Sequence, residues 1–110
     1  MKEYPKRIER ELKELAGQAY ENELGRELGE LAQHFDDWRD GKIGASDLTE
    51  LVHQYHNGPA RELWKKYNGP FTELLVASAI VNGILQKEQV SEETRPYVEE
   101  AIKRYRLLVQ

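Results

Sequence analysis

Residues 71–85 (FTELLVASAIVNGIL) constrain the fold most, because they are apolar around most of a helical circumference. A helix that is apolar on nearly all sides is buried in a protein core or in a membrane. This stretch includes Glu73, Ser78 and Asn82, and it is too short and too polar to cross a bilayer. The sequence therefore predicts a central buried helix over 71–85 in a small soluble bundle.

Length and composition narrow the class of protein. A chain of 110 residues is the size of one domain, predicted to cover 1–110. The net charge is -4 with both signs interspersed, which argues against a nucleic-acid binder. The sequence contains no cysteine, so disulfides, thiolate metal sites and cysteine nucleophiles are excluded. No apolar run follows the basic N-terminus, so we expect no secretory signal, no membrane association and a cytoplasmic location.

The first half of the chain predicts one long helix from about Pro5 to Trp38. Two apolar stripes follow helical spacing within it: Ile8, Leu12, Leu15 and Ala19, and then Leu24, Leu28, Leu31, Phe35 and Trp38. A step of five residues between the stripes rotates the second by roughly 150°. The helix is then continuous with two buried faces, or it has a π-bulge, or it breaks near Asn22. We favour the continuous helix, since no proline intervenes.

A continuous helix leaves the first stripe in need of a partner. Its four residues, Ile8, Leu12, Leu15 and Ala19, are the predicted interface of a homodimer. The expected partners are therefore a second copy or another protein.

Capping residues, glycines and prolines predict where the remaining helices begin and end. Ser46 is a candidate N-cap for a helix that ends at His56, before Asn57-Gly58. Pro59 would open a third helix, and Asn68-Gly69-Pro70 would separate it from the central one. The last helix would follow Ser91, with Pro96 in its first turn. The predicted fold is an all-α bundle of about five helices.

The loop after the long helix resembles a degenerate EF-hand. With Gly41 as the sixth residue of the calcium loop, the resemblance implies ligands from Asp36, Asp40, the carbonyl of Lys42 and Asp47. Trp38 takes the third ligand position and offers no oxygen, and Asp47 is shorter than the usual bidentate glutamate. The implied cofactor is at most a weakly bound calcium or magnesium ion, and otherwise none.

Two other polar patterns have a functional and a purely structural interpretation. Glu50 and His53 form one Glu-x-x-His motif, but a di-iron bundle needs two such motifs, so a solvated helix face is favoured. Around Gly58-Pro59 the sequence gathers a candidate ligand site or packing network: His53, His56, Arg61, Glu62 and Tyr67. Packing is the favoured interpretation, because buried polar groups simply need partners.

The segment from Trp38 to Tyr67 also resembles a small uncharacterised bacterial all-helical protein family. The resemblance rests on W-x-x-G-x-I at 38–43, Leu48, His53 and HNGPARELW-x-x-Y at 56–67. It implies shared structure at this corner and no particular activity. The leading functional prediction is a non-catalytic interaction module, and the alternative is a metal-responsive domain of EF-hand type.

Overall fold

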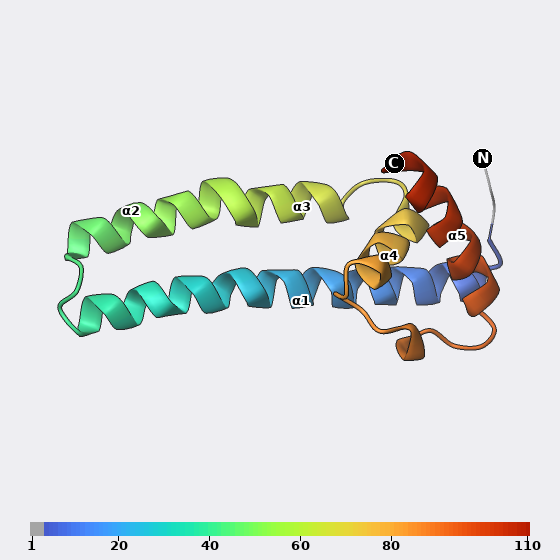
Figure 1. Ribbon diagram of the computed structural model, residues 1–110, viewed down its shortest axis with the longest axis horizontal. Coiled ribbons are helices and arrows are strands. Elements are labelled where there is room, and N and C mark those ends of the chain that lie inside the picture. Colours follow the sequence, from blue (N-terminus) through green and yellow to red (C-terminus); the bar gives the residue numbers. More distant parts are fainter. Residues whose placement is uncertain (1–3) are drawn as a thin grey trace. The chain divides into compact units, whose positions relative to one another are not determined.

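The computed structural model describes residues 4–110, which are helical without any strand (Figure 1). The elements in chain order are α1 (Lys6–Arg39), α2 (Ala45–Tyr55), a π-helical turn (His56–Ala60), α3 (Arg61–Tyr67), α4 (Thr72–Val81), a 3₁₀ turn (Lys87–Gln89) and α5 (Arg95–Leu108). The all-α class is confirmed. Because α2, the π-helical turn and α3 follow one another without a break, the described chain has four helices rather than five.

The chain divides into two compact units, and α1 contributes to both. The hairpin unit is Glu21–Asn68, and the terminal unit combines the chain up to Tyr20 with Gly69–Gln110. Helix α1 is continuous through Asn22, as predicted, so the two stripes belong to different units.

The first stripe of α1 lies in the core of the terminal unit. Ile8, Leu12, Leu15 and Ala19 are all buried within the single chain. Helix α4 packs against α5, and these helices and their connection add further buried residues: Val76, Ala77, Ala79, Leu85, Val90, Val98, Ala101 and Ile102. The stripe therefore has intramolecular partners, and the reason for predicting a dimer interface through it is removed.

The predicted central helix is shorter and more exposed than expected. Helix α4 ends at Val81, and Phe71 before it is 61% exposed. Gly83 adopts a positive φ of 76°, its N–H bonds the carbonyl of Ile80, and the N–H of Ile84 bonds that of Ala79. This pair of bonds is a Schellman motif, which ends a helix at a left-handed glycine. The apolar run continues to a buried Leu85, but the helix does not.

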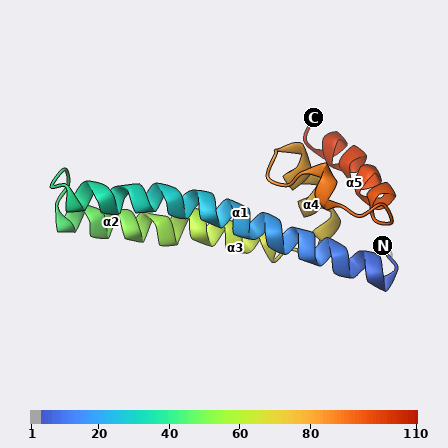
Figure 2. The ribbon, with the colours of Figure 1, turned by 90° about the horizontal axis from the view of Figure 1, so that it is seen from below.

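The hairpin unit pairs the second half of α1 with α2 and α3, which run back alongside it (Figures 1 and 2). The connecting turn uses Gly41 at a φ of 77°. Helix α2 begins at Ala45, so the predicted Ser46 cap is wrong. Gly44 is the N-cap, and its N–H donates to the carboxylate of Asp47 at 2.9 Å. An acidic side chain in this position satisfies a backbone donor at the helix start.

Asn57-Gly58 does not end a helix, contrary to the prediction. The backbone stays right-handed from Tyr55 to Arg61, with Pro59 inside the π-helical turn. A proline inside an α-helix lacks the N–H for the i−4 bond and clashes with that carbonyl. The wider π-helical turn shifts the bonding by one residue, and Gly58 has no Cβ to meet the proline ring. The joint at Asn68-Gly69 does end α3, as predicted.

Candidate interaction surface on the helical hairpin

The hairpin unit buries little apolar surface. Leu48 is the one buried apolar residue among those described between 21 and 68. The second stripe of α1 is only half-buried at Leu24, Leu31 and Phe35. Two helices have only one mutual face, whereas a bundle of three or four encloses a core. The hairpin therefore leaves apolar side chains without cover.

Large apolar side chains are exposed along both arms of the hairpin. Leu28 on α1 is 47% exposed, Val52 on α2 is 37% exposed and Trp64 on α3 is 59% exposed. Trp38 at the end of α1 is also exposed. A single exposed apolar residue is normal on a protein surface. Four of them in one small unit point to an interaction surface, because exposed apolar patches mark interaction sites.

Helical geometry places the exposed residues of α1 and α2 on one flank. At about 100° per residue, Leu28 lies roughly 160° around α1 from Glu30, and Val52 lies roughly 160° around α2 from Gln54. Glu30 and Gln54 face each other across the other flank. We call the surface formed by Leu28, Ala32, Phe35 and Val52 the open flank. An open hollow along α1 includes Leu28, Ala32 and Phe35.

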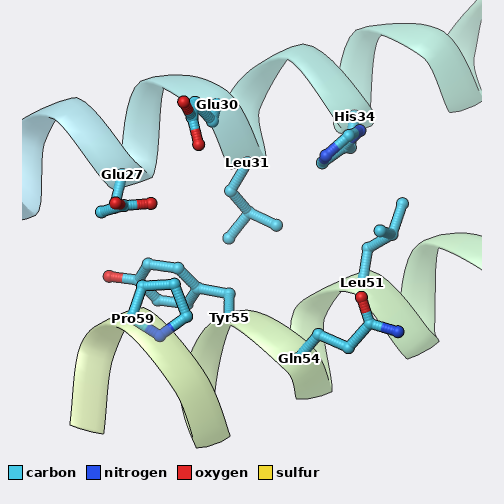
Figure 3. A pocket seen from close by; sticks show the side chains of 8 residues that line it. All are labelled: Glu27, Glu30, Leu31, His34, Leu51, Gln54, Tyr55 and Pro59. Atoms are coloured by element: carbon cyan, nitrogen blue, oxygen red, sulfur yellow. The ribbon is translucent and has the colours of Figure 1, made fainter. Parts of the chain in front are cut away.

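The other flank holds a small hollow lined by both polar and apolar side chains (Figure 3). Its volume is about 220 Å³, below the roughly 300 Å³ at which small-molecule pockets begin. Glu27, Glu30 and His34 reach over it from α1, and Leu31 points between the helices toward Tyr55 (Figure 3). The hollow is too small and too open to enclose a ligand.

A polar lock joins α1 to the end of α3. The hydroxyl of Tyr67 donates to the carboxylate of Glu23 at 2.5 Å, and Nζ of Lys66 donates to the same oxygen at 3.0 Å. Burial alone would raise the pKa of Glu23, but these two partners outweigh it and hold that pKa below its ordinary value. Burial, followed by the bond to Glu23, raises the pKa of Tyr67 far above 10. The lock fixes the end of the hairpin that lies opposite its connecting turn.

The structure places most of the residues predicted around Gly58-Pro59 at the surface. Four of them are exposed, and none lines the hollow between α1 and α2: His53, His56, Arg61 and Glu62. Tyr67 is half-buried and belongs to the polar lock. Glu23, which accepts the bond from Tyr67, was not predicted as a site residue. It lies more than forty residues before Tyr67 in the sequence, and no local pattern marks it.

The carboxylates of the EF-hand-like loop have other contacts. Asp36 lies within α1 and accepts a hydrogen bond from Arg39 at 3.1 Å, and Asp47 accepts from Gly44. Asp40 and Lys42 are exposed in the turn. Over residues 4–110, no group of three or more His, Cys, Asp or Glu side chains is arranged to hold a metal ion. Glu50 and His53 are both exposed on α2.

Comparison with known proteins gives no information on function. The chain matches no known protein family, and no curated protein or solved structure is detectably similar to it. Within the described residues, no helix combines the length and apolar character needed to span a membrane. Function must therefore be argued from the open flank and its chemistry.

Proposed function

We propose that this protein is a non-catalytic interaction module that binds an apolar protein surface through the open flank of its hairpin. The observation that supports the proposal most is the contrast between the two units. The terminal unit contains all but one of the buried apolar residues described, although it also exposes Phe71 and residues 107–109. The hairpin buries Leu48 alone and exposes Leu28, Val52 and Trp64. Fully burying a large apolar side chain that was fully exposed is worth about 1.5–3 kcal/mol. Leu28, Val52 and Trp64 are only partly exposed, so covering each contributes less, and several must be covered together to drive association.

The polar lock supports the same proposal. A hairpin whose far end is fixed by Glu23, Lys66 and Tyr67 presents its open flank in one arrangement before a partner arrives. A surface ordered in advance loses less conformational entropy on binding. No arrangement of nucleophile and base among the described residues offers a comparable case for catalysis. No observation favours the metal-responsive alternative.

The proposal is tested by placing a charge on the open flank. Leu28→Glu and Val52→Glu each put a carboxylate where apolar contact is expected, at side chains that are 47% and 37% exposed. Helical circular dichroism checks that each variant keeps its fold. Gln54→Glu is the matched control, because it adds the same charge on the other flank.

The measurement is quantitative capture of proteins, including untagged copies of this chain, from a lysate of the source cells. We expect specific capture by wild type and by Gln54→Glu, and at least a tenfold loss with Leu28→Glu and with Val52→Glu. Equal capture by all four proteins would refute the open flank as a binding surface.

A further inference from the structure

We propose that the occupant of the open flank is a second copy of this chain, with the two α1 helices antiparallel and crossing at the level of Glu30. This inference rests on the proposed function and names its partner. It begins with six positions on α1 at steps of four, three, four, three and four: Glu21, Gly25, Leu28, Ala32, Phe35 and Arg39. Such spacing places all six within an arc of about 80°, as in the seam of an antiparallel bundle.

The chemistry of these six positions is self-complementary. A two-fold axis at the level of Glu30 sets Leu28 beside the partner's Ala32, so a large side chain meets a small one. It sets Phe35 beside the partner's Gly25, where a ring meets a position with no side chain. It sets Glu21 beside the partner's Arg39, so that opposite charges meet at both ends of the contact. In a two-fold interface each pairing occurs twice.

A parallel arrangement would lack this fit. It would place Phe35 against the partner's Phe35, Glu21 against its Glu21 and Arg39 against its Arg39. Like charges and paired bulky rings both oppose association. The sequence of the seam therefore selects the antiparallel register.

The surroundings of Gly25 are compatible with this pairing. Gly25 lies inside α1, where glycine is unfavourable relative to alanine, and a Cβ placed on it would meet nothing within 4 Å. Packing within the chain therefore does not require a glycine here. Packing against a second copy would use a glycine at this position, because the partner's Phe35 needs the space.

The charged ends are free to take part. The side chain of Arg39 is 67% exposed, and its bond to Asp36 at 3.1 Å is a surface contact that leaves other guanidinium donors available. Glu21 is also exposed. The seam from Glu21 to Arg39 is about 27 Å long, and Val52 extends the apolar surface onto α2.

The first test is a charge exchange in the full-length chain, read by sedimentation velocity over a wide range of concentration. Glu21→Arg alone and Arg39→Glu alone each replace two attractive pairs with two repulsive ones, so each is expected to weaken the dimer about tenfold. The double variant restores both pairs and is expected to recover the wild-type dissociation constant. A monomeric wild type at every concentration, or a double variant no tighter than the singles, would overturn the proposal.

Mixing the two single variants tests whether the charged ends of the seam meet across the dimer. The charge exchange above decides between the registers, because a parallel pair would also favour this heterodimer. A heterodimer of Glu21→Arg with Arg39→Glu pairs opposite charges at both ends, whereas each homodimer pairs like charges. Native mass spectrometry is expected to show the heterodimer in clear excess over both homodimers. A statistical mixture would exclude the antiparallel pairing.

Gly25→Leu tests the steric part of the seam. It is expected to abolish the dimer while leaving the monomer folded and slightly more stable, since leucine favours a helix. Gly17→Leu is the matched control, at an exposed position on the same helix outside the seam with equal space around it. Loss of the dimer in both variants, or in neither, would contradict the assignment.

These results remain distinguishable from failure of the proposed function. If wild type stays monomeric while protein capture still depends on Leu28 and Val52, the open flank binds a different protein and only the self-pairing is wrong. If capture is also unaffected by those substitutions, both proposals fail.

Discussion

Glu11 shows how a single side chain on α1 holds a distant loop in the terminal unit. Its carboxylate accepts bonds from the N–H of Ser91 at 2.8 Å, from the Ser91 hydroxyl at 2.6 Å and from the Thr94 hydroxyl at 2.8 Å. Burial alone would raise the pKa of Glu11, but these three donors outweigh it and lower that pKa. The carboxylate thus fixes the chain just before α5 begins.

The lowered pKa of Glu11 gives stability a defined dependence on pH. A carboxyl group with a lowered pKa in the folded state stabilises that state above its ordinary pKa, and the contribution is lost as pH falls through the lowered value. We expect Glu11→Gln to reduce the free energy of unfolding by about 1–2 kcal/mol at neutral pH, after allowance for partial exposure. The difference from wild type should disappear in acid.

Urea unfolding followed by helical circular dichroism over a series of pH values measures this effect. Glu14→Gln is the control, because Glu14 is an exposed carboxylate of the same helix. A difference between wild type and Glu11→Gln that stays constant from neutral pH into acid would show that the charge of Glu11 is not what holds the loop.

Residue-level contacts were the hardest to predict from sequence. Glu11 with Ser91, and Glu23 with Tyr67, each join residues at least forty positions apart, and nothing local marks which surface glutamate will find such a partner. By contrast, the buried positions Ile8, Leu12, Leu15 and Ala19 followed from spacing alone. What spacing did not reveal was whether their cover came from the same chain or from another.

At the scale of elements, two of the three Asn-Gly pairs end a helix and the third lies within one. The pair at Asn68-Gly69 follows α3 as predicted. The pair at Asn57-Gly58 lies within continuous helix, because Pro59 accepts a helical φ and the π-helical turn accommodates it. The pair at Asn82-Gly83 ends α4, although the surrounding apolar run suggested a longer helix. An Asn-Gly pair permits a helix stop, and neighbouring residues decide whether it is used.

Gly83 is the residue that makes the stop after α4 possible. Its φ of 76° is unfavourable for any residue with a Cβ, so we expect Gly83→Ala to destabilise the protein by about 1 kcal/mol. Gly17→Ala in α1 is the matched control and should stabilise by up to about 1 kcal/mol. Both glycines have open space around the added methyl group, so conformation alone separates them. Thermal unfolding shifts of the same sign would contradict this explanation.

At the scale of the whole molecule, composition predicted the all-helical class, and proline and glycine punctuation predicted much of the helix order. The division into two units was not predicted. It arises because α1 is longer than either set of helices that covers it, so each of its two stripes belongs to a different unit. The out-of-phase stripes carried this information, but they were equally compatible with a bulged or broken helix.

The two units differ in how much apolar surface each buries within one chain. The terminal unit has a closed core, whereas the hairpin unit has Leu48 as its one buried apolar residue among those described. Regions with few buried contacts open more readily, and binding protects them. We therefore infer that a partner completes the hairpin.

Hydrogen exchange of the full-length protein, measured at low and high concentration, shows whether the hairpin is complete in the single chain or needs a partner. At low concentration, amides of α2, α3 and the second half of α1 should exchange faster than the buried amides of α4 and α5. At high concentration, protection should rise in the hairpin and stay constant in the terminal unit. Hairpin amides that are as protected as those of α4 and α5 at every concentration would show that the hairpin is complete in the single chain.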